Sequence, residues 1–205
     1  MKKATSALAF IAILLMVTGA APTQAKTAWE DPAGDATGVD DNAPSSPRPS
    51  DPQLDIRTAS FSVEGDSIIA TVKMEKGGFA VASGGTVWRF YFTHKSGTYF
   101  FQALAATPEY SQVFTSTPRF YKVPTGAVQD PTSNGEELKC DCKMVTDVAG
   151  GSVKFTIKTA GVAKSLKVAP GGIELTKMDV RTYRRANFYT LTDVAPAPAK
   201  ATFKA

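Results

Sequence analysis

The chain has 205 residues, of which 43% are hydrophobic and 20% are charged. This balance is ordinary for a globular protein with one domain, and it excludes a chain that is disordered throughout. The formal net charge of +4 is small for a strongly basic nucleic-acid-binding protein, so we expect no nucleic-acid partner.

The first 25 residues have the order of a secretory signal peptide. Lys2 and Lys3 precede an apolar run over 7–17, and Thr23-Gln24-Ala25 follows, with small residues at positions −3 and −1 of the expected cleavage site. The run has about eleven residues, against the ~20 that a membrane-spanning helix needs. We therefore expect cleavage after Ala25, with Ala21 as the second choice. The sequence predicts a secreted, extracellular protein without a transmembrane segment, and a single domain over 26–205.

Beyond residue 25 the chain shows strand alternation and almost no helical periodicity. In the segment 86–94, for example, Trp88, Phe90 and Phe92 alternate with Arg89 and Tyr91. We expect strands over 57–64, 67–75, 86–94, 98–105, 119–123, 138–145, 152–159, 173–183, 188–191 and 201–203. Turn residues separate these strands, and no helix is needed. The pattern predicts an all-β fold, an antiparallel β-sandwich that is jelly-roll-like.

Acidic side chains concentrate directly after the expected signal peptide. Residues 26–66 hold nine acidic and three basic residues, mostly in a Pro/Ser-rich loop over about 30–54. These charges would repel one another unless a bound cation or a basic patch on the rest of the molecule offsets them.

Three of these carboxylates are candidate metal ligands: Asp31, Asp35 and Asp55. The first two flank Pro32 and Gly34, which can bend the loop, and Asp55 stands where the chain enters the first long strand. Ca²⁺ takes six to eight such oxygen ligands. The spacing does not fit an EF-hand, so the fold would have to bring Asp55 back beside the loop. The alternative is a solvated acidic loop that holds no ion.

The Asp31-Pro32-Ala33-Gly34-Asp35 opening, with Asp55-Ile56 leading into a strand, resembles a known family of modules. It is similar to the β-sandwich modules at the C-terminus of glucodextranase-type enzymes, which belong with the DOMON-like and family 9 carbohydrate-binding modules. The resemblance covers residues 29–63. It implies calcium in the acidic loop and a sandwich that binds sugar or serves as a surface module. Related modules carry a Tyr-rich run where this chain has the Pro/Ser-rich residues 42–49, so their sugar contacts do not transfer.

The two cysteines, Cys140 and Cys142, lie on one expected strand. Residues i and i+2 of a strand face the same side with Cα atoms about 6.6 Å apart, near the upper end of disulfide geometry. In an oxidising compartment we expect a Cys140–Cys142 disulfide, with two free thiols as the alternative. A thiolate metal site lacks the remaining ligands.

Candidate ligand-binding residues are Arg89 and Tyr91, because we expect Tyr91 to expose its ring on the face opposite Trp88 and Phe90. The single histidine, His94, has no nucleophile motif beside it, and we assign no catalytic residue.

The sequence predicts a secreted, calcium-stabilised binding or surface module. Its expected partner is a polysaccharide or another cell-envelope polymer. The alternatives are a secreted carbohydrate-active hydrolase, whose carboxylates converge only in the fold, and a purely structural envelope protein.

Overall fold

A computed structural model describes residues 26–36, 39–40, 43–47, 54–75, 86–105, 118–125, 135–147, 150–169, 171–185 and 189–205. The expected signal peptide over 1–25 lies outside the described residues, as do parts of the acidic loop.

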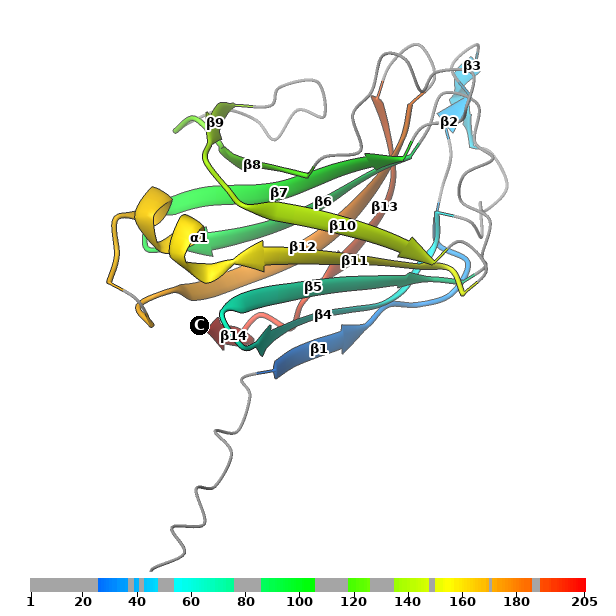
Figure 1. The fold of residues 1–205 in the computed structure, drawn as a ribbon. Coiled ribbons are helices and arrows are strands. Elements are labelled where there is room, and N and C mark those ends of the chain that lie inside the picture. The colour runs from blue at the N-terminus through cyan, green and yellow to red at the C-terminus, as the bar shows by residue number, and fades with distance from the viewer. Residues whose placement is uncertain are drawn as a thin grey trace, which may run out of the picture.

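Two antiparallel sheets face each other (Figure 1). The five-stranded sheet has the order β1-β4-β5-β11-β10. Its strands are β1 (Lys26–Glu30), β4 (Ile56–Glu64), β5 (Ser67–Met74), β10 (Cys142–Asp147) and β11 (Ser152–Lys158). The all-β antiparallel sandwich is therefore the fold that the sequence predicts.

The seven-stranded sheet has the order β13-β12-β6-β7-β8-β9, and its seventh strand, β14, also pairs with β12. Its strands are β6 (Thr86–His94), β7 (Gly97–Ala105), β8 (Arg119–Lys122), β9 (Glu136–Leu138), β12 (Glu174–Arg185), β13 (Tyr189–Pro196) and β14 (Thr202–Lys204). A separate two-stranded ribbon joins β2 (Val39–Asp40) to β3 (Ala43–Pro47). That ribbon lies within the segment that the sequence predicts to be a loop.

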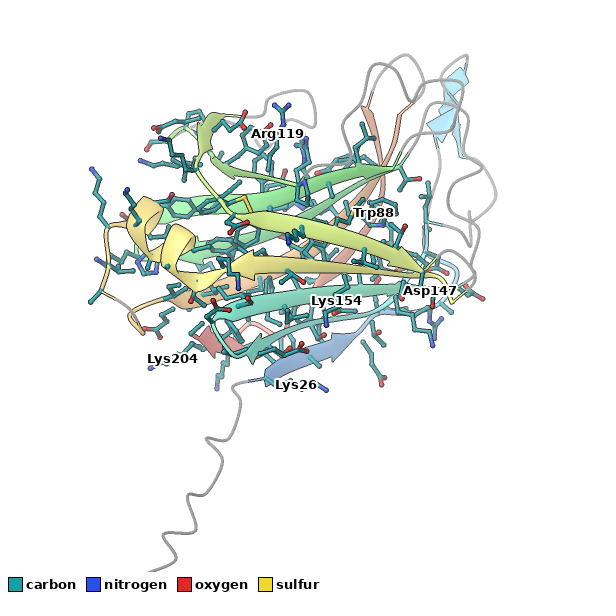
Figure 2. All side chains as sticks on the ribbon, viewed as in Figure 1. Lys26, Trp88, Arg119, Asp147, Lys154 and Lys204 are labelled. Atoms are coloured by element: carbon teal, nitrogen blue, oxygen red, sulfur yellow. A yellow bond between two sulfur atoms is a disulfide. The ribbon has the colours of Figure 1, made fainter. Side chains whose placement is uncertain are left out.

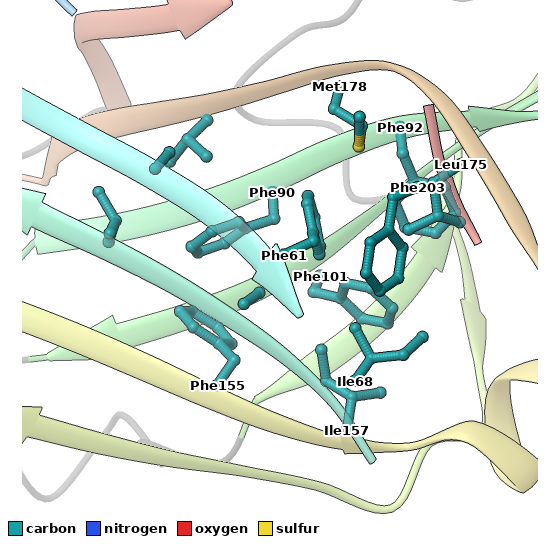
Figure 3. Close-up of a cluster of buried hydrophobic side chains, with 14 of the residues drawn as sticks. Phe61, Ile68, Phe90, Phe92, Phe101, Phe155, Ile157, Leu175, Met178 and Phe203 are labelled. Carbon is teal, nitrogen blue, oxygen red and sulfur yellow. The ribbon is translucent and has the colours of Figure 1, made fainter. Parts of the chain in front are cut away.

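The hydrophobic core lies between the two sheets (Figure 3). In β6 the alternation turns Trp88, Phe90 and Phe92 inward. The Phe90 ring packs edge-on against Phe155 of β11, with ring centroids 4.8 Å apart, and against Phe61 of β4 at 5.8 Å. Burying a side chain of this size stabilises the fold by roughly 1.5–3 kcal/mol. The aromatic contacts therefore join strands of both sheets.

One helix, α1 (Thr159–Leu166), follows β11, so the expectation that the fold needs no helix is wrong. Its buried residues are Val162, Ala163 and Leu166, which form one short apolar stripe. Eight residues are too few for a helical repeat to stand out, because the period is recognised over windows of 11–18 residues. No helix in the described part of the chain has the length and apolar character required to cross a bilayer.

The segment 138–145, expected as one strand, is divided between the two sheets. β9 ends at Leu138 in the seven-stranded sheet, and β10 begins at Cys142 in the five-stranded sheet. Residues 139–141 therefore form a crossing between sheets rather than the middle of a strand. Alternation alone cannot reveal such a crossing, because both halves keep the period of two. The short strand β1 was also not expected, since Trp29 is its only large apolar residue.

Candidate metal centre

Four aspartates from distant parts of the chain meet at one end of the sandwich. Asp31 and Asp35 lie in the loop that follows β1, Asp55 directly precedes β4, and Asp193 lies in β13. β1 and β4 are antiparallel neighbours, so the end of the first strand lies beside the start of the second. The Asp31 N–H donates to the Arg57 carbonyl oxygen at 3.1 Å, which fixes the start of the loop on β4.

Asp193 comes from the opposite sheet and reaches across to β4. Its Oδ2 accepts a hydrogen bond from the Ile56 N–H at 2.6 Å, and its Oδ1 accepts one from the Val194 N–H at 2.7 Å. The β12–β13 register shifts beside it, between Thr182 and Tyr183. Such irregularities redirect side chains, and here the redirected carboxylate links the two sheets.

Asp55 shapes the loop that carries the first two aspartates. Its Oδ2 accepts a hydrogen bond from the Gly34 N–H at 2.6 Å, and its backbone carbonyl accepts one from the Glu75 N–H at 2.8 Å. Gly34 has a φ of +79°, in the left-handed region that glycine adopts without strain. The glycine expected to bend the loop therefore does so at the residue that contacts Asp55.

Asp31, Asp35 and Asp193 each offer an oxygen atom, and these three atoms lie within 4.8 Å of one another. Asp35 is exposed, whereas Asp31 is 7% and Asp193 is 6% exposed, and Asp55 is fully buried. Within the described part of the chain, Asp31 Oδ2 and Asp55 Oδ1 are buried without a hydrogen-bond partner. Leaving such an oxygen unsatisfied costs about 1–3 kcal/mol, and more if it is ionised.

The surroundings favour the protonated form of the buried carboxyls. Burial first, and then the charges of the other three aspartates, raise the pKa of Asp31 from 3.8 to about 7. Burial raises the pKa of Asp193 to about 6, although two backbone N–H groups favour its ionised form. Burial, and then the neighbouring Glu75 carboxyl, raise the pKa of Asp55. Without a cation, this site therefore resists being fully charged at neutral pH.

The donor set suits a hard divalent cation. All the converging groups are carboxylates, and Ca²⁺ prefers oxygen ligands in a flexible arrangement. An ion placed among Asp31, Asp35 and Asp193 would offset the repulsion among the three carboxylates, and it could give a partner to the buried Asp31 Oδ2. Asp55 contributes through the loop and through its own unpartnered oxygen.

Of the three sequence-predicted ligands, Asp31 and Asp35 converge with Asp193, and Asp55 lies beside them through its hydrogen bond with Gly34. Sequence reasoning missed two carboxyls of this group, Asp193 and Glu75. Asp193 lies 137 residues beyond Ile56, to which it bonds. A single Asp next to a predicted strand gives no sequence signal that it will meet a residue 137 positions away. For Glu75 the sequence does hold a signal. Asp55 precedes one strand of the predicted hairpin and Glu75 ends the other, so the hairpin brings the two residues together.

The two candidate ligand-binding residues, Arg89 and Tyr91, lie on the face of β6 opposite the core but are not exposed. Arg89 is fully buried and Tyr91 is 2% exposed, so the expectation of an exposed Tyr91 ring is wrong. The Arg89 guanidinium donates to Gln102 Oε1 at 2.7 Å and to the Tyr91 hydroxyl at 3.2 Å. It also lies 4.7 Å from the centroid of the Phe100 ring. These residues form a packed polar and aromatic layer instead.

A second arginine closes this layer. The Arg181 guanidinium lies 4.3 Å from the centroid of the Tyr91 ring and donates to both carboxylate oxygens of Asp179, at 2.8 and 3.0 Å. Stacking and a two-point ion pair hold the ring in place. Arg89 and Tyr91 are therefore buried by contacts with other residues of the same fold.

Cys140 and Cys142 form a disulfide, as predicted. Their Cα atoms are 5.4 Å apart, shorter than the strand spacing of about 6.6 Å. The reason is that Cys140 lies in the crossing between sheets, before β10 begins. The bridge therefore lies where the chain bends, and not within a strand.

His94 is 5% exposed at the end of β6, and its Nδ1 lies 2.9 Å from the Glu174 carbonyl oxygen. A carbonyl can only accept, so Nδ1 carries the proton in this arrangement. The bond ties β6 to β12.

No protein-family model, curated protein or solved structure matches the chain. The likeness of residues 29–63 to glucodextranase-type modules stays a prediction.

Proposed function

We propose that the protein is a secreted, calcium-stabilised β-sandwich that acts as a binding or surface module. The observation that supports the calcium site is the group of buried carboxylates with unpartnered oxygens at Asp31 and Asp55, beside Asp35 and Asp193. Secretion rests on the signal-peptide pattern of residues 1–25. The partner we propose is a polysaccharide or a related cell-envelope polymer.

Repulsion among the ionised carboxylates favours a bound cation. Two unit charges 4.8 Å apart repel by about 3.5 kcal/mol at an effective dielectric constant of about 20. Among the described residues, the cation that lowers the pKa of both Asp31 and Asp55 is Arg57. One positive charge cannot balance four carboxylates, whereas Arg57 together with a divalent ion leaves a small residual charge.

The ion would connect the two sheets, because its ligands come from both of them. Asp31 and Asp55 belong to the β1–β4 edge of the five-stranded sheet, and Asp193 belongs to β13 of the other sheet. Binding to the folded state alone stabilises it by about 2.7 kcal/mol when the ion is present at about one hundred times its Kd. For a chain of this size, the melting temperature rises by about 5–10 °C.

The test is thermal unfolding followed by circular dichroism at pH 8, in calcium, in magnesium and in chelator. We expect calcium to raise the melting temperature and magnesium to raise it much less, because magnesium is smaller and gives up its water reluctantly. Asp35→Asn and Asp193→Asn should each remove the calcium response. The matched control is Asp147→Asn, an exposed aspartate on β10 that should leave the response intact.

Identical melting in calcium and in chelator would contradict the proposal, because the acidic loop would then hold no ion. A calcium response that Asp147→Asn also removes would place the ion elsewhere.

A second candidate function, the secreted hydrolase, is favoured by the raised pKa values of Asp31 and Asp193, since glycosidases pair a protonated with an ionised carboxyl. The burial of both groups and the backbone bonds to Asp193 oppose it, because a substrate must reach the carboxyls. Release of reducing sugar from soluble polysaccharides by wild type, and its loss in Asp31→Asn, would establish hydrolysis instead.

A further inference from the structure

The outer face of the five-stranded sheet is formed mainly by serine, threonine and lysine side chains. By outer face we mean the side chains of β1, β4, β5, β11 and β10 that alternate with those facing the hydrophobic core. Every residue of these five strands is described, and none places an aromatic ring on this face. Figure 2 shows Lys26 on β1 and Lys154 on β11, which belong to it.

Hydroxyl groups occupy the centre of the outer face in register. Ser60 pairs with Thr71 on the next strand, and Ser62 pairs with Ile69, which in turn pairs with Thr156. Neighbouring strands lie about 4.8 Å apart, and residues two apart on one strand lie about 6.6 Å apart. A hollow of about 460 Å³ opens over this grid, and its charged lining residues are Lys26, Lys154 and Glu64. The grid offers hydrogen-bond donors and acceptors at regular intervals.

Three lysines cross the same face in a diagonal stripe. Lys154 of β11 pairs with Thr71 on β5 and with Val145 on β10. Lys73 lies two residues beyond Thr71, and Lys143 lies two residues before Val145. The register places these two lysines on opposite sides of the Lys154 row. Diagonal neighbours of this kind lie about 7–8 Å apart, so the stripe is about 15 Å long.

Part of this positive charge has no acidic partner. Lys154 Nζ lies 3.2 Å from Glu64 Oε2, and both side chains are about half exposed. Lys73 and Lys143 are exposed and make no ion pair with any described residue. The other two acidic residues of this face lie at its margins, Glu30 on the edge strand β1 and Asp147 at the end of β10. Lys154 shares its charge with Glu64, so the positive charge without an ion-pair partner among the described residues is that of Lys73 and Lys143.

We propose that the outer face binds an extended anionic polysaccharide, with Lys73 and Lys143 pairing with its carboxylate or phosphate groups and Lys154, held by Glu64, lying between them. The grid of serine and threonine hydroxyls matches a ligand rich in hydroxyl groups. A single-stranded nucleic acid would find no aromatic ring on this face to stack on. Membrane binding is disfavoured because Ile69 and Val145 are the only large aliphatic side chains that these five strands place on the outer face. The inference rests on the proposed function and names the ligand class of that module.

The test is binding of the intact protein to carboxymethyl-dextran, dextran phosphate, unmodified dextran of the same length and duplex DNA. We expect the wild type to bind the charged dextrans and not unmodified dextran, more weakly as salt rises. Lys73→Gln/Lys143→Gln should weaken this binding about fivefold or more, since each exposed charge contact contributes modestly. The control Lys164→Gln/Lys200→Gln removes the same charge from other elements and should change binding less than twofold.

Preference between carboxymethyl-dextran and dextran phosphate identifies the anionic group. The inference is overturned if unmodified dextran binds equally well, if DNA binds as tightly as the charged dextrans, or if the control loses as much affinity. It is also overturned if none of the four binds. The calcium dependence of melting, measured on the same preparations, tests the metal site independently, so the two failures can be told apart.

Discussion

At the scale of single residues, Asp31 makes the stability of the metal-free protein depend on pH. Burial raises its pKa to about 7 from an ordinary value of 3.8. Between these values the folded protein binds more protons than the unfolded chain. In chelator, the free energy of unfolding should therefore fall by a few kcal/mol as pH rises from about 4 to about 7, and then level off. Urea unfolding at a series of pH values measures this.

The substitution Asp31→Asn separates the role of the charge from that of the shape. The amide has nearly the size of the carboxyl and no charge to desolvate. In chelator at pH 8, we expect this variant to be more stable than wild type and to have a flatter pH profile. In calcium it should show no gain. A variant that is less stable than wild type in chelator would mean that the ionised form of Asp31 is already satisfied without an ion.

Gly34 offers a conformational test of the same site. A Cβ added at Gly34 would meet no atom within 4 Å, so Gly34→Ala changes only the cost of φ +79°, about 1–2 kcal/mol. We expect it to reduce stability and to weaken the calcium response, because the Gly34 N–H holds Asp55. Gly171→Ala is the matched control, since Gly171 has a φ of +76° and equally open surroundings. Calorimetry should show a similar loss for both in chelator, and a smaller calcium gain only for Gly34→Ala.

At the scale of elements, the Cys140–Cys142 bridge closes a loop of three residues and restricts the unfolded chain little. The entropic model gives about 1.5 kcal/mol for such a loop, below the 2–4 kcal/mol typical of longer ones. We expect Cys140→Ser/Cys142→Ser to lose about that amount in urea unfolding and to keep the sandwich. A loss above about 3 kcal/mol would show that the bridge holds the crossing between sheets together. Reduction of the wild type should give the same result.

The elements that the sequence predicts best are those with a long alternating pattern. β6 is found over the predicted residues 86–94 because one side of it faces the core and the other does not. The eight-residue helix α1 and the five-residue strand β1 are too short to show a period. The crossing at 139–141 is hidden because alternation does not say which sheet a strand joins.

The candidate metal site also has a part that the sequence predicts and a part that it does not. The half on the loop, Asp31 and Asp35, is visible in the sequence because a bendable acidic segment has a local signature. The half on β13, Asp193, depends on how two sheets pack, and no local pattern encodes that. Exposure of Tyr91 was mispredicted for the same reason, since alternation gives the face of a side chain and not what contacts it.

At the scale of the whole molecule, the proposed ion would hold together one edge of the sandwich. Trp29 Nε1 donates to the Ala195 carbonyl oxygen at 3.0 Å, and the Ile56 N–H donates to Asp193, so β1 and β4 both bond to β13 there. These bonds bridge the two sheets, whereas β6 and β7 pair along nine residues inside one sheet. Loss of the ion should therefore loosen the bridged edge first.

Hydrogen exchange followed by mass spectrometry can measure this at the level of peptides. In chelator at pH 8, we expect faster exchange in 26–36, 54–58 and 193–197, because opening of this edge exposes the Gly34 and Ile56 amides. Peptides from 86–104 should keep their protection, since their pairing does not depend on the carboxylates. Asp193→Asn should show the faster exchange of 54–58 in calcium as well. Uniform acceleration across both sheets would instead mean that the ion stabilises the fold globally, with no separate opening of the β1–β4–β13 edge.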